Sequence, residues 1–226
     1  PNNLVLKVLE TRADLGIAFD GDGDRVLMVD RDGEILDGDV LLYIIACYQK
    51  KMGKLVGGVV GTLMSNLGFE QALARHEIPF VRANVGDRYV MEKLLENNWA
   101  LGGENSGHII SLRHTTTGDG IISALQVLRA MCESKKSLKD LHADLKLFPQ
   151  VLINVRLKPG FDALSDDTVL ASVKSAEDRL GNAGRVLLRK SGTEPLVRVM
   201  VEGEDEELVN SLAREIANVI IRLSQS

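Results

Sequence analysis

The 226-residue chain has little of what would place it in several classes of protein. It has only two cysteines, Cys47 and Cys132, which provide neither a disulfide framework nor zinc-ligand spacing. We expect both to be small buried side chains in a reducing compartment. Aromatic residues make up only 4% of the chain, so its cores must rest on Val, Leu, Ile, Ala and Met.

Long apolar runs and a net positive charge are also missing. The longest apolar run, residues 41–47, is far shorter than the roughly 20 residues that span a bilayer, and no signal segment is seen at the N-terminus. The net charge of −5 offers no general field for nucleic acid or an anionic membrane. We therefore expect a cytoplasmic enzyme with no nucleic-acid or membrane partner. Because Pro1 opens on what is expected to be the tail of a helix, we also expect a truncated chain.

Apolar runs and helical patterns alternate along most of the sequence. Residues 1–37 contain two expected strands, 14–19 and 26–30, and are too few to fold alone. Residues 38–147 alternate strand and helix, which predicts a three-layer α/β/α domain with helices on both faces of a mixed sheet. Residues 148–226 follow the order β-α-β-β-α, which predicts a small α+β domain with helices on one face. The predicted fold class is therefore α/β, with a smaller C-terminal domain.

An acidic loop, DGDGDR, follows the first expected strand. Asp20, Asp22 and Asp24 alternate with glycines, which let the backbone bend so that the carboxylates converge. Mg²⁺ prefers such oxygen ligands, and Arg25 beside it could hold a phosphate. A Ca²⁺ EF-hand is excluded because Arg occupies positions 6 and 12. A plain Asp-Gly turn remains the alternative, although three crowded carboxylates would repel one another without a cation.

A second polar loop, at residues 102–108, carries a carboxylate, an amide, a hydroxyl and an imidazole: Glu104, Asn105, Ser106 and His108. This set suits sugar hydroxyls, which both donate and accept, and His108 suits proton transfer. A polar turn with a satisfied histidine is an equal alternative on this loop alone. The other histidines are interpreted as structural or surface residues: His76, His114 and His142.

Two more loops carry candidate ligands. Residues 189–195, RKSGTEP, join two expected strands and suit one phosphate through a backbone anion nest, although a charged hairpin turn is the alternative. The candidate phosphate ligands are Arg189, Ser191, Gly192, Thr193 and Arg198. At a strand-to-helix junction, Gly86, Asp87 and Arg88 are candidate substrate contacts. Asp119, in contrast, is predicted to cap the helix that starts after it.

In this order, the loops resemble those of the α-D-phosphohexomutase superfamily. Its members carry a DGDGDR metal loop, a G-E-x-S-G-H sugar loop and an S-G-T-E-P phosphate loop, which stand here at residues 20–25, 103–108 and 189–195. Other segments are similar to its phosphoglucosamine mutase branch: GTLMSN at 61–66, VGDRYV at 85–90, TTTGDG at 115–120 and LLRKSGTEPLVRVMVEGE at 187–204.

The resemblance implies interconversion of glucosamine 6-phosphate and glucosamine 1-phosphate through a phosphoserine and a bisphosphorylated sugar. It implies a Mg²⁺ cofactor on the three aspartates and catalytic roles for Arg25 and His108. The implied sugar contacts are Glu104, Asn105, Ser106, Gly86, Asp87 and Arg88. The implied ligands of the non-reacting phosphate are Arg189, Ser191, Gly192, Thr193 and Arg198.

The superfamily has four domains, and the resemblance implies that residues 1–37 end domain 2, 38–147 form domain 3 and 148–226 form domain 4. The T-A-S-H-N-P loop of domain 1, with its phosphoserine, does not occur in these 226 residues. The implied partners are hexosamine phosphates and bisphosphates and the missing N-terminal domains, with a homodimer left open, and the chain alone is expected to be inactive. Two alternatives remain: a phosphoglucomutase/phosphomannomutase, or a non-catalytic phosphosugar-binding fragment.

Overall fold

The computed structural model describes residues 1–158, 160–191 and 194–225. The chain divides into two compact units, Pro1–Lys146 and Leu147–Ser226. The domain limits predicted at residues 37 and 147 stay predictions.

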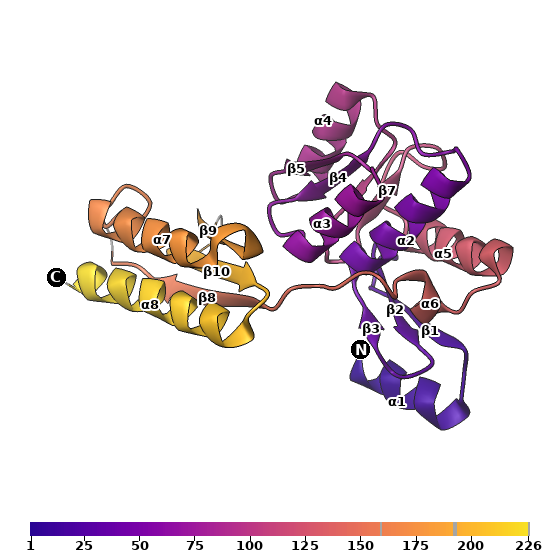
Figure 1. The fold of residues 1–226 in the computed structure, drawn as a ribbon, viewed down its shortest axis with the longest axis horizontal. Coiled ribbons are helices and arrows are strands. Elements are labelled where there is room, and N and C mark those ends of the chain that lie inside the picture. The colour runs from indigo at the N-terminus through magenta and orange to yellow at the C-terminus, as the bar shows by residue number, and fades with distance from the viewer. Residues whose placement is uncertain (159, 192–193, 226) are drawn as a thin grey trace. The chain divides into compact units, whose positions relative to one another are not determined.

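The first unit begins with a helix packed on a small antiparallel sheet (Figure 1). Its elements are α1 (Asn2–Thr11), β1 (Leu15–Phe19), β2 (Val26–Asp30) and β3 (Ile35–Leu36), with strand order β1-β2-β3. Phe19 pairs with Val26, so the acidic loop closes the β1–β2 hairpin. The two-residue β3 was not predicted, because two residues are too short to show an alternating pattern.

A four-stranded mixed sheet forms the centre of the first unit, with order β5-β4-β6-β7. Its strands are β4 (Val59–Thr62), β5 (Phe80–Ala83), β6 (Leu101–Gly103) and β7 (Ile109–Ser111). The first three are parallel and β7 is antiparallel to β6, which confirms the predicted mixed sheet. Because parallel strands end at the same edge, the loops that follow β4, β5 and β6 leave the sheet together.

Helices cover both faces of this sheet, α4 on one and α2 and α3 on the other (Figure 1). The helices of the unit are α2 (Gly38–Lys51), α3 (Leu67–Arg75), α4 (Asp87–Asn97), α5 (Gly120–Ser134) and α6 (Leu138–Leu141). Asp37 caps α2 by accepting from the backbone N–H groups of Asp39 and Val40, at 3.0 and 3.1 Å. Residues 40–46 of α2 are all buried, because this helix packs against α3, α5 and β6.

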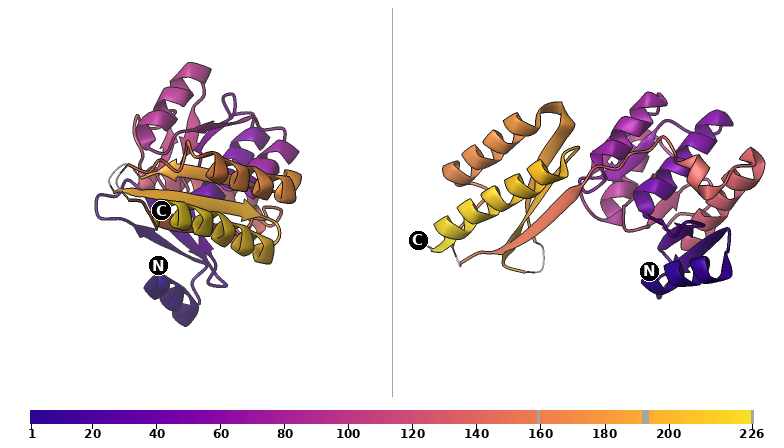
Figure 2. Two further views of the ribbon diagram at one scale, coloured as in Figure 1. Left: turned by 90° about the vertical axis from the view of Figure 1, so that its left-hand side faces the viewer. Right: turned by 60° about the horizontal axis from the view of Figure 1, so that its bottom comes forward.

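The second unit is an antiparallel sheet of order β8-β10-β9 with two long helices side by side on one face (Figure 2). Its elements are β8 (Gln150–Arg156), α7 (Asp167–Leu180), the 3₁₀ turn Gly181–Ala183, β9 (Gly184–Lys190), β10 (Leu196–Gly203) and α8 (Glu206–Gln225). The central strand β10 and helix α8 supply much of the core, including the fully buried Val199 and Ile220. Each such side chain contributes about 1.5–3 kcal/mol of transfer free energy. This arrangement confirms the predicted α+β unit.

Two further findings concern the helices: whether any could cross a membrane, and how deeply their cysteines are buried. Among the residues that the structure describes, no helix is both long enough and apolar enough to cross a membrane. Cys47 on α2 is half-buried, whereas Cys132 on α5 is exposed, so the prediction of two buried cysteines is wrong for Cys132.

Candidate functional site

The acidic loop brings its carboxylates together. Asp20, Asp22 and Asp24 each place one carboxylate oxygen within 4.8 Å of the other two. The Asp20 carboxylate also accepts from the backbone N–H of Arg25 at 3.2 Å. Desolvation, the largest single effect, acts to raise the pKa of Asp20, but its interaction with Asp24, the hydrogen bond from the Arg25 backbone and the Arg25 charge together lower it. The loop is thus a turn whose carboxylate oxygens gather on one point.

Asp24 links this loop to the imidazole of His108, which lies 84 residues further along the chain. Its Oδ2 accepts from His108 Nδ1 at 3.0 Å, while its Oδ1 is buried. His108 is itself buried, and neither its Nε2 nor Asp24 Oδ1 has a hydrogen-bond partner in the ranges that the structure describes. The residues present therefore fit a divalent cation, because one buried oxygen and two more exposed carboxylates are left to coordinate it.

Backbone contacts hold the two polar loops against each other. The N–H of Val26 donates to Gly107 O at 3.2 Å, and Arg25 and His108 form an antiparallel bridge. Gly107 has φ of +93°, and a Cβ there would come within 2.1 Å of Val26 O. Only glycine satisfies both conditions, so this residue fixes the approach of the loops.

The segment before α5 completes this cluster of loops. Gly120 N donates to Gly23 O at 2.9 Å, which ties the segment to the acidic loop. A Cβ at Gly118 would lie 2.3 Å from the His108 ring, so the backbone of Gly118 packs directly on the imidazole. Asp119 accepts from Ile122 N at 2.9 Å, which confirms the predicted helix cap.

The polar loop with Glu104 also contacts the loop that follows β5. Glu104 Oε1 accepts from Gly86 N at 2.9 Å, so two predicted substrate loops meet at this carboxylate. Asn105 is half-buried and its carbonyl accepts from Gly38 N at 3.0 Å, while Ser106 is exposed. The side chains of Glu104 and Ser106 therefore stand at the edge of the sheet where a ligand can reach them.

Asp87 and Arg88 are placed differently from Glu104. Both are exposed at the start of α4, and Arg88 Nε donates to Glu92 Oε1 at 3.0 Å along the helix surface. Hydrogen bonding to Glu92, followed by its charge, raises the pKa of Arg88. A role for Arg88 at the sugar needs this pair to open first.

The phosphate-type loop lies in the second unit and joins β9 to β10. Arg189 and Arg198 stand directly opposite each other in the strand pair. Their Nε atoms and Ser191 Oγ are buried and have no hydrogen-bond partner among the residues that the structure describes. Burial, and then the charge of Arg198, lowers the pKa of Arg189. Gly192 and Thr193 lie outside the described residues.

Two facing like charges with unsatisfied donors indicate an anion site. Lys190 is not part of it, because its ammonium donates to Asp162 at 2.9 Å. The arginine pair and the serine hydroxyl are the donors that this side of the loop offers.

Comparison with known proteins identifies the family to which the chain belongs. Residues 37–148 match the family model of phosphoglucomutase/phosphomannomutase α/β/α domain III, and residues 152–219 match that of the C-terminal domain. The chain belongs to the phosphoglucomutase/phosphomannomutase family.

Curated relatives in this family carry a more specific name. The chain is 58% identical over 216 residues to a phosphoglucosamine mutase of Shewanella piezotolerans, covering 96% of this chain and 48% of that protein. It is also 58% identical over 217 residues to one of Aliivibrio fischeri, covering 96% of this chain and 49% of that protein. The chain thus spans about half the length of the curated relatives that it matches.

Solved structures of the phosphohexomutase kind share the fold. The Aspergillus fumigatus N-acetylphosphoglucosamine mutase, in complex with GlcNAc-6P and magnesium, aligns with a TM-score of 0.79 at 22% identity. That alignment covers 92% of this chain and 48% of the other. A Burkholderia thailandensis phosphoglucomutase/phosphomannomutase family protein aligns with a TM-score of 0.77 at 18% identity, covering 99% and 49%.

Sequence reasoning missed the partners of two histidines in this family member. His76 contacts Asp144 at 2.7 Å and Tyr43 at 2.8 Å, and His142 lies beside two carboxylates. The interpretation of both as structural or surface residues stays a prediction. These partners are far apart in sequence, so no local motif signals them.

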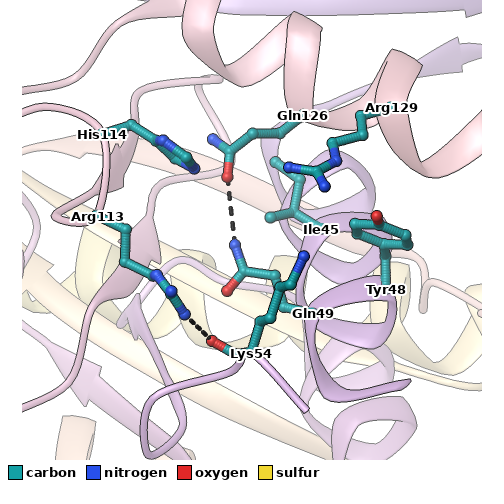
Figure 3. Close-up of a pocket in the computed structure, with 8 residues that line it drawn as sticks. All are labelled: Ile45, Tyr48, Gln49, Lys54, Arg113, His114, Gln126 and Arg129. Carbon is teal, nitrogen blue, oxygen red and sulfur yellow. Dashed lines mark hydrogen bonds between the residues drawn. The ribbon is translucent and has the colours of Figure 1, made fainter. Parts of the chain in front are cut away.

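A pocket of about 140 Å³ lies apart from the predicted site residues (Figure 3). Its lining residues are Ile45, Tyr48, Gln49, Lys54, Arg113, His114, Gln126 and Arg129. Gln49 Nε2 donates to Gln126 Oε1 across it at 3.2 Å. None of these lining residues belongs to the acidic loop, the Glu104 loop or the phosphate-type loop.

Proposed function

We propose that this chain is the C-terminal part of a phosphoglucosamine mutase, which interconverts glucosamine 6-phosphate and glucosamine 1-phosphate. The observation that carries the proposal is the convergence of Asp20, Asp22 and Asp24, with Asp24 bonded to His108 of the polar loop. The names of relatives at 58% identity support the choice of sugar. The chain spans about half of their length, so the activity belongs to a longer protein.

The acidic loop would hold Mg²⁺, with the three aspartates as its protein ligands. The bound ion would neutralise negative charge on the phosphate that is transferred. Arg25 lies beside the same carboxylates, 3.8 Å from Asp20 and 3.9 Å from Asp24, and its half-exposed guanidinium can turn to a phosphate.

His108 would act through its free ring nitrogen. Because Asp24 is an acceptor, Nδ1 of His108 carries the shared hydrogen and Nε2 is left to hydrogen-bond or exchange a proton with the substrate. Gly118 fixes the ring plane from the other side. This gives His108 one orientation, which general acid–base chemistry needs.

Sugar binding would fall to the loops joined at Glu104. One Glu104 oxygen holds Gly86 N, and the other can accept from a sugar hydroxyl, beside Ser106 and Asn105. Asp87 and Arg88 complete the proposed set at the start of α4. The distal phosphate would bind Arg189, Arg198 and Ser191 in the second unit, together with Gly192 and Thr193.

The assay that tests this proposal uses a full-length protein carrying this chain, supplied with glucosamine, glucose and mannose 6-phosphates in turn. We expect the highest kcat/KM on the glucosamine phosphate. A preference for mannose or glucose phosphate would instead support the phosphoglucomutase/phosphomannomutase alternative.

The 226-residue chain is assayed beside it. Because the chain has no T-A-S-H-N-P serine loop, we expect no mutase turnover from it alone, although it should still bind sugar phosphate. Turnover by the isolated chain would contradict the need for a phosphoserine in the other half.

A further inference from the structure

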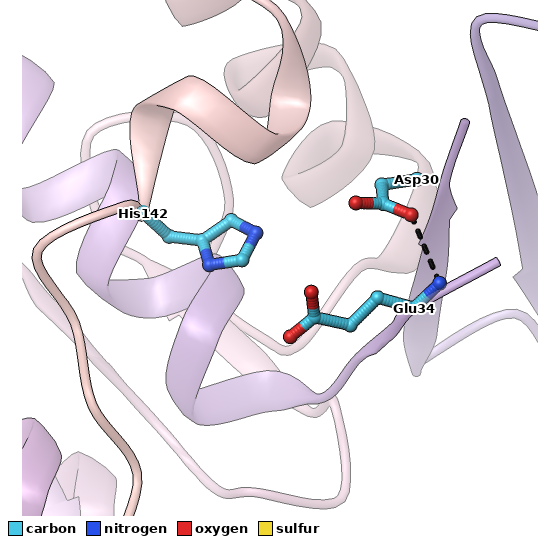
Figure 4. Close-up of side chains that lie close together, drawn as sticks. All are labelled: Asp30, Glu34 and His142. Carbon is cyan, nitrogen blue, oxygen red and sulfur yellow. Dashed lines mark hydrogen bonds between the residues drawn. The ribbon is translucent and has the colours of Figure 1, made fainter. Parts of the chain in front are cut away.

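A second group of potential metal ligands lies away from the acidic loop. Asp30 at the end of β2, Glu34 in the turn before β3, and His142 at the end of α6 each offer one ligand atom within 4.8 Å of the others. Figure 4 shows the two carboxylates and a ring nitrogen of His142 turned toward one another. Nothing in the proposed mutase reaction uses these three residues.

Two members of this group are buried and incompletely bonded. Asp30 is 1% exposed and His142 is 7% exposed. Within the described part of the chain, neither Asp30 Oδ2 nor His142 Nε2 has a hydrogen-bond partner. Leaving a polar atom buried and unpaired is unfavourable, so two such residues with ligand atoms within 4.8 Å of each other indicate a missing ligand.

Asp30 is oriented for this role by its own turn. Its Oδ1 accepts from the backbone N–H groups of Asp32 and Glu34, both at 2.9 Å. Those bonds fix the carboxylate and leave Oδ2 facing His142. A metal-binding carboxylate is commonly held in this way, with one oxygen on the backbone and one on the ion.

We propose that Asp30, Glu34 and His142 bind a divalent transition-metal ion of the Zn²⁺ class, which ties the β2–β3 turn to α6. An imidazole in the set favours Zn²⁺ over Mg²⁺, which takes oxygen ligands. Two ligand atoms on one tetrahedral zinc lie roughly 3.3 Å apart, because each bond is about 2.0–2.1 Å long. Glu34 is exposed, so its side chain can rotate to close the group around the ion.

Lys139 is the rival source of positive charge. Its ammonium donates to Asp32 Oδ2 at 2.6 Å, on the same turn. That bond satisfies Asp32, but it leaves Asp30 Oδ2 and His142 Nε2 without a partner. The metal accounts for both of these atoms, whereas the lysine accounts for neither.

The test is Zn²⁺ binding by the metal-stripped 226-residue protein, measured by equilibrium dialysis with elemental analysis and by Co²⁺ absorption as a spectroscopic reporter. Excess Mg²⁺ is present throughout to occupy the oxygen-only acidic loop. We expect one Zn²⁺ per chain and a Co²⁺ spectrum with imidazole ligation. His142→Gln should weaken Zn²⁺ binding by at least about 100-fold, whereas the exposed control His114→Gln should leave it unchanged.

Glu34→Gln keeps the test decisive if His142→Gln fails to fold, because Glu34 is exposed and its backbone contacts remain. Glu34→Gln should also weaken Zn²⁺ binding. Zn²⁺ should raise the Tm of the parent protein, and this rise should be absent in the variant. The proposal is overturned if no Zn²⁺ binds in excess Mg²⁺. It is equally overturned if a folded His142→Gln or Glu34→Gln variant binds Zn²⁺ as the parent does, or if Asp24→Asn alone removes the ion.

Discussion

The two units of this phosphohexomutase family member carry opposite charge imbalances. In the first, three aspartates crowd one loop and leave Asp24 Oδ1 buried without a partner. In the second, Arg189 and Arg198 face each other across a strand pair with unsatisfied Nε atoms. Each arrangement is unfavourable in isolation, and the proposed function assigns a complementary ion to each.

The difference teaches that each proposed site would gain binding free energy by relieving repulsion between its own like charges as well as by forming contacts. Single substitutions can test the acidic loop and the arginine pair separately.

Asp24→Asn should give the largest effect. In a full-length protein that carries this chain, we expect kcat to fall by about 100-fold or more and the Mg²⁺ requirement to rise, because a neutral amide is a poor ligand. The amide oxygen can still accept from His108, so the variant separates metal binding from histidine orientation. The readout is a Mg²⁺ titration of activity, with the exposed Asp14→Asn as control. Wild-type activity at limiting Mg²⁺ would refute the metal assignment.

Arg189→Gln tests the pair of facing arginines in the second unit and should give the next largest effect. Inorganic phosphate should bind about 10–100-fold more weakly to the variant, because one charge-assisted donor is lost. Without phosphate, the variant should be as stable as the parent or more stable, since one of two facing positive charges is gone. Thermal unfolding with increasing phosphate measures both, and the exposed Arg214→Gln on α8 serves as the control. A variant stabilised by phosphate as strongly as the parent would exclude this site.

Asp39→Asn should make stability less dependent on pH. Burial, and then the charge of Asp37, raises the pKa of Asp39 to about 7, from an ordinary value of 3.8. The folded state therefore holds this proton more tightly than the unfolded chain, and stability falls as pH rises from about 4 to about 7. The total loss is at most about 4 kcal/mol, at about 1.4 kcal/mol per pKa unit.

Urea unfolding of both proteins at pH 5 and pH 8 measures this effect. The amide should keep the 2.7 Å bond from Asn66 N, so the variant should be the more stable protein at pH 8. The matched control is Asp167→Asn, an exposed first-turn aspartate in the other unit. If the free energy of unfolding changes between pH 5 and pH 8 by the same amount in Asp39→Asn and in the parent, Asp39 does not titrate in this window.

Gly118→Ala should give the smallest effect, about 1–3 kcal/mol of stability, because its Cβ would overlap the His108 ring. Displacement of the ring should also reduce activity in the full-length protein. Gly21→Ala is the matched stability control, since a Cβ there meets nothing within 4 Å. Equal unfolding free energies for the two variants, by urea titration, would mean that the imidazole is not held against Gly118.

Local sequence pattern predicted most of this fold. β2 stands at residues 26–30, as predicted, and β1 begins one residue after its predicted start at residue 14. β4 shows where local pattern is insufficient, because residues 55–56 are apolar but the glycines at 57 and 58 let the chain pass Trp99 before pairing begins at Val59. Strand pairing, which depends on distant residues, decided this case rather than propensity.

The sequence predicted the loops of the candidate site, but not how these loops contact one another. The composition of each loop indicated which ligands it could bind. No local sequence pattern could predict the contact of Asp24 with His108 or of Glu104 with Gly86. Those contacts depend on parallel strands ending at one edge and on the backbone approach at Gly107. The pairing of Arg88 with Glu92 is different, because the two residues are four apart on a helix and such a pair can be expected from the sequence.

The Val26–Gly107 hydrogen bond bears on how this protein can be recombined with its relatives. A chimera that joins foreign sequence at residue 37 would keep the Glu104 loop but replace the hairpin that anchors it. The exchanged segment should therefore carry residues 15–36 together with the Glu104 loop, so that donor and acceptor backbones stay matched. Natural exchange of parts within the family would face the same restriction.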